Sequence, residues 1–233
     1  MERPEGKAQG TQRWHRLLFS HWEVPQHALK PLVHPRLTLD TFEGRAFVGV
    51  VAFQMQRVKP FGFGVPTATN FREINVRTYV HLDGQERGVV FLSLDADSAL
   101  ATLAARTLWR VPYHRSRIAH DDRGASVTWS CDRSWPGPAM TGFRAEFDVG
   151  VELPPPQPGS LEHFLVERYQ FYTGREGEPL RRARVHHAPY PLHAVPRCDI
   201  TDALVAGFPR GPRTADWFSE GVDVEMFGVE RVP

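Results

Sequence analysis

The stretch between residues 74 and 94 constrains the fold of this chain more than any other segment. In residues 74–82, side chains such as Ile74 and Val76 alternate with polar ones such as Asn75 and Arg77, the period-two pattern of a β-strand. Residues 88–94 form a second strand-like run, and the Asp-Gly dipeptide at 83–84 is a favoured hairpin turn. The stretch therefore predicts an antiparallel hairpin.

Strand-like runs also dominate the remainder of the chain. Further strands are predicted at 16–24, 45–58, 116–120, 125–132, 141–152, 168–173, 180–188, 200–207 and 222–229. The clearest helix follows an N-cap at Asp97 or Ser98 and ends before Pro112, and shorter helices are expected after Pro25 and after Ser160. Many strands without β-α-β alternation predict an α+β class with a mainly antiparallel sheet.

The domain organisation follows from the polar and proline-rich segments. Residues 1–12 are polar and are expected to form a disordered tail, and residues 13–233 are expected to form one domain. The run 153–159 contains four prolines, and we interpret it as a long surface loop, with a domain boundary as the alternative.

Composition gives no support to several classes of partner and site. The formal net charge of +1 gives no field that would attract a nucleic acid. No apolar run is long enough for a membrane helix and the N-terminus lacks a signal-peptide core, so we expect a cytoplasmic protein without a membrane partner. Cys131 and Cys198 stand alone, and the adjacent His186 and His187 would point to opposite faces of a strand, so no metal site is predicted.

A set of polar side chains shares one face of the first hairpin strand. If Ile74 faces a packed layer, period two places the polar set on the other face: Glu73, Asn75, Arg77 and Tyr79. This face is either a solvated surface or the polar wall of a pocket.

Two segments resemble a known family. Residues 71–80, with Phe-Arg-Glu at their start, and residues 106–114, with the frame Arg106-x-Leu108-Trp109-x-x-Pro112, are similar to YqjF-type bacterial proteins of unknown function. These proteins belong to the acetoacetate decarboxylase-like superfamily. The resemblance implies a mainly antiparallel, cone-like β-barrel with a central cavity, a few flanking helices and a tendency to form homo-oligomers. It also implies that Glu73 lies in the cavity.

This sequence differs from the decarboxylases of the superfamily at the positions of their catalytic amines. The lysine pair that follows the Trp-x-x-Pro sequence in decarboxylases, one member of which forms a Schiff base, falls here on Tyr113 and His114. Neither side chain forms a stable iminium with a ketone, and Lys59 is the only plausible substitute among the lysines of the sequence. Decarboxylation through an iminium is therefore not expected.

Three functions remain open. The first is a binding protein for a small carbonyl compound or organic acid, without a cofactor, in which the ligand contacts Arg77, Tyr79, Arg106 and Trp109. The second is an enzyme in which Glu73 and His114 act as acid and base and Tyr113 donates to an oxyanion. The third is an oligomeric scaffold.

Overall fold

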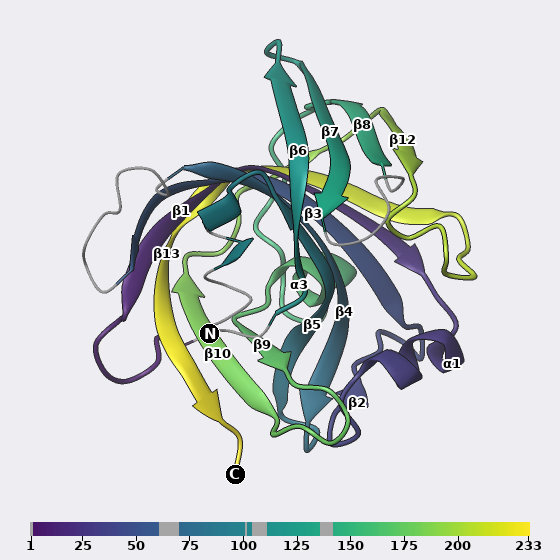
Figure 1. Cartoon of the computed structure of the whole chain (residues 1–233). Helices are drawn as coiled ribbons and strands as arrows, with labels where there is room; N and C mark the ends of the chain where they lie inside the picture. Colours follow the sequence, from purple (N-terminus) through teal and green to yellow (C-terminus); the bar gives the residue numbers. More distant parts are fainter. Residues whose placement is uncertain (1, 61–69, 101, 104–110, 136–141) are drawn as a thin grey trace.

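Seven strands close into a β-barrel. The computed structural model describes residues 2–60, 70–100, 102–103, 111–135 and 142–233. The barrel strands follow the order β5-β9-β10-β13-β1-β3-β4, and pairing of β4 with β5 closes the ring. Their bounds are β1 (Gly10–Glu23), β3 (Phe47–Pro60), β4 (Phe71–Leu82), β5 (Glu86–Ala96), β9 (Gln170–Thr173), β10 (Arg181–His187) and β13 (Arg213–Arg231). Figure 1 shows this ring of strands.

Four further strands extend the sheet beyond the barrel. The extension consists of β6 (Tyr113–Asp122), β7 (Ser126–Trp135), β8 (Gly142–Asp148) and β12 (Cys198–Asp202), and it joins the barrel through parallel pairing of β6 with β5. In Figure 1 the β6-β7 hairpin projects from one side of the barrel. Two short strands complete the sheet: β2 (Thr38–Leu39) pairs with β4, and β11 (Leu192–Ala194) pairs with β13.

Helices are short in the described part of the chain. They are α1 (Gln26–Leu29), the 3-10 turn η1 (Lys30–Leu32) and α3 (Leu161–Val166). Ser160 caps α3 as predicted, because its hydroxyl oxygen accepts the His163 backbone N–H at 3.2 Å. The predicted helix after Ser98 has its first i to i+4 bond, from the Thr102 N–H to the Ser98 carbonyl at 3.0 Å, but residues 101 and 104–110 lie outside the described residues. Within the described ranges, no helix is long and apolar enough to cross a membrane.

The closed seven-strand barrel confirms the expected fold, and the structure is mostly β. The predicted hairpin is present as β4 and β5, with Asp83 and Gly84 both at positive φ in the turn. One boundary differs from the prediction. Residues 10–12 were expected in the disordered tail, whereas β1 begins at Gly10, because this polar segment forms backbone pairs with both β13 and β3.

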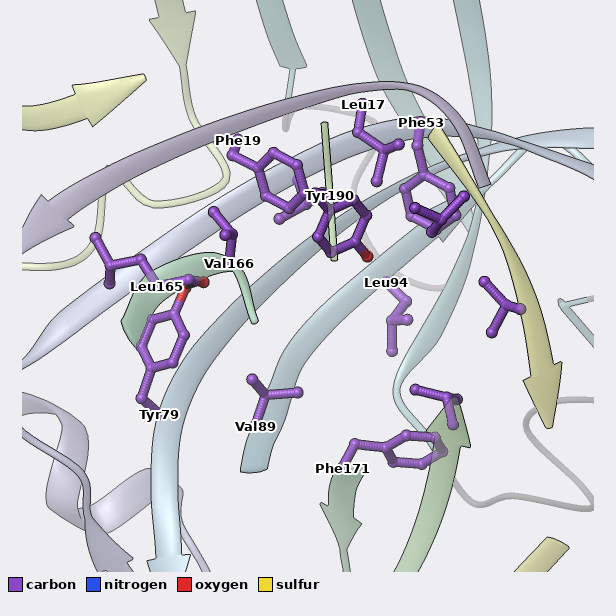
Figure 2. Packing of buried hydrophobic residues seen from close by; sticks show 14 of the residues in the cluster. Leu17, Phe19, Phe53, Tyr79, Val89, Leu94, Leu165, Val166, Phe171 and Tyr190 are labelled. Carbon is purple, nitrogen blue, oxygen red and sulfur yellow. Dashed lines mark hydrogen bonds between the residues drawn. The ribbon is translucent and has the colours of Figure 1, made fainter. Parts of the chain in front are cut away.

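Two hydrophobic layers lie on opposite faces of the β3-β4 wall. Alternate residues such as Val48, Val50 and Ile74 face outward, where they pack against β6, β7 and β8. The intervening residues, such as Val51 and Phe53, face the barrel interior. Figure 2 shows the interior cluster, in which Phe19 and Tyr190 lie near Phe53 and the residues of α3 lie beside Tyr79. The polar face of β4 is therefore turned into the barrel and not toward solvent.

Candidate functional site in the barrel

The barrel interior holds a cavity of about 90 Å³. Its wall is mostly apolar and aromatic. The polar side chains that line it come from β1, β4, β6, the segment at the start of β9 and the connection from β10 to β11: Gln12, Glu73, Asn75, Arg77, Tyr113, Arg168, Gln170 and Tyr190. A mainly apolar cavity with a few converging polar groups has the character of a small-molecule site.

Glu73 and Tyr113 meet in this cavity. The Tyr113 hydroxyl donates to Glu73 Oε2 at 2.5 Å, and the Asn75 amide nitrogen donates to Glu73 Oε1 at 3.4 Å. The three side chains come together because Glu73 and Asn75 share one face of β4, while parallel pairing places Tyr113 beside Leu94 on β5. The structure therefore brings two of the candidate residues, Glu73 and Tyr113, into direct contact.

The ionisation of this pair is shifted by burial. Desolvation raises the pKa of Glu73 from about 4.5 to about 7, and the negative charge of Asp95 adds to the increase, whereas the bonds from Tyr113 and Asn75 lower it. Burial also raises the pKa of Tyr113 well above its usual value, and the adjacent Glu73 charge acts in the same direction. Glu73 can therefore exchange a proton near neutral pH, while Tyr113 keeps its proton.

Arg77 places a buried cation in the cavity wall. Its Nη2 donates to the Leu165 carbonyl at 2.8 Å and its Nε donates to the Tyr79 hydroxyl at 3.3 Å. The side chain is 8% exposed, and in the described part of the chain no Asp or Glu forms an ion pair with it. Buried charges are normally paired, so this guanidinium favours an anionic ligand.

Tyr79 was expected to contact the ligand, but it is not among the described residues that line the cavity. Its hydroxyl donates to the Leu165 carbonyl at 2.9 Å, as Figure 2 illustrates, and accepts from Arg77. The same hydroxyl lies 2.8 Å from His21 Nε2, and because the Tyr79 proton goes to Leu165, His21 must donate there. Tyr79 thus positions Arg77 and lies behind the cavity wall.

Arg168 was not predicted from the sequence. It lines the cavity, donates from Nη1 to Asp40 Oδ2 at 2.7 Å and from Nε to the Phe164 carbonyl at 2.8 Å. Asp40 and Arg168 are both buried, with 4% of each side chain exposed. Arg168 lies two residues after the apolar end of α3, and this position was the available signal, because charged residues are rarely buried without a specific partner.

Tyr190 is another cavity residue that the sequence did not reveal. Its backbone N–H donates to Glu167 Oε1 at 2.9 Å, and Glu167 Oε2 accepts from the Tyr169 hydroxyl at 2.5 Å. In Figure 2 the Tyr190 hydroxyl points across the interior toward Leu94. Its segment carries no recognisable motif, and only the long-range pairing of β13 with its neighbours brings it to the site.

Glu73 lines the cavity, but His114 is not among the described residues that line it. Because β6 begins at Tyr113, adjacent side chains point to opposite faces, and His114 pairs in register with Asp95, whereas Tyr113 pairs with Leu94. Asp95 faces the extension, where it accepts from Ser116 and Arg133. The other two predicted contacts, Arg106 and Trp109, lie outside the described residues.

In the histidine-rich segment that begins at His186, His187 packs against aromatic rings. His187 stacks on Tyr169 with ring centroids 4.6 Å apart, and its Nδ1 lies 2.8 Å from the Ala188 carbonyl. Desolvation lowers the pKa of His187. Within the described ranges, no three His, Cys, Asp or Glu side chains are grouped as metal ligands.

Comparisons with known proteins agree with this architecture. Residues 11–223 match the model of DUF2071, a family described as an uncharacterized conserved protein. The uncharacterized protein YqjF of Bacillus subtilis (strain 168) is 33% identical over 190 residues, which cover 81% of this chain and 77% of that protein.

Solved structures of similar fold are enzymes by their descriptions. Acetoacetate decarboxylase from Legionella pneumophila aligns with a TM-score of 0.69 at 12% identity, covering 100% of this chain and 92% of that chain. An acetoacetate decarboxylase-like enzyme from Sphingomonas wittichii RW1 aligns at 0.65 and 14% identity, covering 97% and 94%. The enduracididine biosynthesis enzyme MppR complexed with pyruvate aligns at 0.66 and 12% identity, covering 99% and 93%. At these identities the likeness shows the fold alone.

Proposed function

The chain belongs to the DUF2071 family, and from the geometry of its barrel we propose that it binds a small organic acid or carbonyl compound in the central cavity. The single observation that carries the proposal is Arg77, a buried guanidinium that faces the cavity and bonds to neutral oxygens. A carboxylate placed there would gain charge-assisted hydrogen bonds in a desolvated setting.

The state of Glu73 supports a ligand with a single negative charge. Arg168 is balanced by Asp40, so Arg77 leaves one positive charge in the wall. Burial raises the pKa of Glu73 to about 7, and below that pH this carboxyl is mainly protonated. A monocarboxylate then neutralises the site, whereas a dianion leaves an unpaired buried charge.

The lysines support binding without a Schiff base. Lys7, Lys30 and Lys59 are the lysines of the sequence, all three are exposed, and none lines the cavity. An iminium requires an amine within reach of the ligand carbonyl, and none of these three side chains lies in the cavity wall. We therefore propose that the DUF2071 chain does not decarboxylate oxo acids by the iminium route.

The binding proposal is tested with Arg77→Met. Titration calorimetry would compare propionate and pyruvate with the neutral analogue propionamide. We expect the carboxylates to bind, propionamide to bind poorly, and Arg77→Met to weaken carboxylate binding about 30-fold or more, because removing one partner of a buried charge pair costs at least about 2 kcal/mol.

Arg123→Met is the matched control, because Arg123 is exposed and, among the residues that the structure describes, forms its ion pair with Asp121 at the surface of the β6-β7 turn. It should leave binding unchanged. Equal binding of propionate and propionamide, or full affinity in a folded Arg77→Met variant, would overturn the proposal.

A second candidate function rests on the Glu73–Tyr113 pair. A carboxyl with a pKa near 7 suits proton abstraction from the carbon beside a carbonyl, with the proton passing to Glu73 and the C–H electrons forming an enolate. The test is exchange of the pyruvate methyl protons with deuterium oxide, followed by proton NMR. Catalysis predicts a rate that rises with pH through about 7, because the base must be ionised, and that is lost in Glu73→Gln. No exchange above the buffer rate would leave binding as the function.

A further inference from the structure

The Tyr190 hydroxyl is a polar group that faces the cavity. Tyr190 is 3% exposed and lines the cavity, and in Figure 2 its hydroxyl points across the barrel interior toward Leu94. Within the described residues the hydroxyl forms no hydrogen bond, whereas the backbone N–H of the same residue donates to Glu167. The hydroxyl is also not among the described polar atoms that are both unpaired and sealed from free space. Its oxygen is therefore accessible from the cavity.

The position of this side chain is fixed without its hydroxyl. The backbone N–H donates to Glu167 Oε1 at 2.9 Å, and the ring packs edge-on against Phe19 with centroids 5.1 Å apart and against His187 at 4.7 Å. A proline on each side of the residue restricts the backbone. The hydroxyl is thus held in place before a ligand binds, which reduces the entropy that binding costs.

Arg77 lies near Tyr190 and also offers a donor to the cavity. Its guanidinium carbon lies 5.7 Å from the centroid of the Phe19 ring, on which Tyr190 packs. Burial raises the pKa of the Tyr190 hydroxyl well above its usual value, and the Arg77 charge is near enough to oppose this increase. Nε and Nη2 of Arg77 donate to Tyr79 and Leu165, and among the described residues Nη1 is neither bonded nor sealed from free space. The two side chains therefore present one cationic and one neutral donor.

The chemistry of this part of the cavity favours a ligand oxygen at the Tyr190 hydroxyl. Because burial raises its pKa, the phenol keeps its proton at neutral pH and acts as a donor. The oxygens of a carboxylate, and a carbonyl oxygen beside it, are acceptors. Apolar side chains such as Val51, which pairs with Phe19, and Leu94 line the same wall. A ligand oxygen that leaves water for an apolar cavity needs such a donor.

We propose that Tyr190 is a ligand-binding residue whose hydroxyl donates a hydrogen bond to an oxygen of the organic acid that Arg77 anchors. This inference rests on the proposed function and assigns a second polar contact to its ligand. The hydroxyl then serves binding and not folding, since the described residues leave it unbonded.

Tyr190→Phe tests the inference, because it removes only the hydroxyl and keeps the ring. Titration calorimetry would measure the binding of propionate and pyruvate to the wild type and to the variant. We expect the variant to bind at least one of the two acids about 10-fold or more weakly, as the loss of a hydrogen bond to a charged or strongly polar acceptor predicts. Its urea midpoint should stay at the wild-type value.

Tyr172→Phe is the matched control. The Tyr172 hydroxyl donates to the Glu86 carbonyl at 2.8 Å, and Tyr172 is not among the described residues that line the cavity. Loss of this hydroxyl breaks a bond within the protein, so we expect a lower urea midpoint. The affinity for both acids should be unchanged.

The outcomes separate the two proposals. Wild-type affinity of Tyr190→Phe for both acids would overturn this inference and leave the proposed function standing. A lower urea midpoint of Tyr190→Phe would show that the hydroxyl bonds within the protein, and it would also overturn the inference. Failure of both acids to bind the wild type would overturn the proposed function itself. A loss confined to pyruvate would support the inference and identify the carbonyl oxygen as the acceptor.

Discussion

The Glu73 carboxyl accepts hydrogen bonds from two neutral donors, the Tyr113 hydroxyl and the Asn75 amide. A neutral donor compensates a buried carboxylate for its lost hydration less well than a paired cation does. Burial therefore dominates and raises the pKa of Glu73 to about 7. The unfolded chain has an ordinary Glu73 with a pKa near 4.5. Folding therefore takes up a proton at this residue between these two values.

This proton uptake makes stability depend on pH. Between about pH 4.5 and pH 7 the folded state keeps a proton that the unfolded state has lost, so the free energy of unfolding decreases as the pH rises. A shift of this size corresponds to about 3 kcal/mol. We predict that Glu73→Gln, which has no titrating group, gains about this much stability relative to wild type between pH 5 and pH 8.

Urea denaturation of both proteins at pH 5 and pH 8 measures this difference, and subtraction removes the contribution of groups that both share. A constant difference between the two pH values would show that Glu73 titrates normally in the folded protein. The second candidate function would then lose its base near neutrality.

At the scale of the element, β4 shows what the sequence could predict. Period-two alternation correctly grouped Glu73, Asn75 and Arg77 on one face, because alternation depends only on local backbone geometry. Alternation left open whether that face contacts solvent or a pocket. The choice depends on closure of the barrel by β4–β5 pairing and on the cover of the outer face by β6 and β7, which are long-range contacts.

The limits of sequence reasoning appear at β6 and after α3. Tyr113 and His114 were assigned to one cavity because both fall on the lysine-pair positions of the family that the sequence resembles. Strand β6 begins at Tyr113, so neighbouring side chains diverge. Arg168 was missed because its role depends on Asp40, which lies 128 residues away in sequence. Partners so distant cannot be inferred from local periodicity.

Strand β13 contains a position where only glycine fits. Gly221 has φ +119° and pairs with His15 of β1, and a Cβ at this position would overlap the Trp14 carbonyl oxygen. Trp14 lines the cavity, so the close approach of the β13 backbone to Trp14 also fixes the position of this part of the cavity wall. We predict that Gly221→Ala lowers the free energy of unfolding by about 3 kcal/mol or more, since backbone strain and a backbone clash combine.

Gly124→Ala is the control for backbone strain alone. Gly124 has φ +80° in the β6-β7 turn, and a Cβ there would have no atom within 4 Å. We expect a loss of about 1 to 2 kcal/mol from the left-handed conformation. Thermal and urea unfolding of the two variants would be compared, and equal losses would contradict the role assigned to the Trp14 contact.

At the scale of the whole molecule, the two hydrophobic layers share one wall. Strands β1, β3 and β4 contribute one set of side chains to the interior layer and the alternate set to the outer layer, which packs against the extension. Phe147 of β8 belongs to the outer layer, is fully buried and packs on Phe218 of β13 with ring centroids 5.9 Å apart. Loss of packing on the outer layer should therefore destabilise the barrel that holds the cavity.

This shared wall predicts that the barrel and the extension unfold as one cooperative unit, as a single domain requires. We expect Phe147→Ala to lower the free energy of unfolding by about 3 to 5 kcal/mol. Tryptophan fluorescence, far-ultraviolet circular dichroism and propionate binding should shift together along one urea transition. The alternative is that the four-strand extension unfolds by itself. In that case, Phe147→Ala would produce an early transition in circular dichroism while propionate binding persists at wild-type urea concentrations, and the single-domain assignment would be wrong.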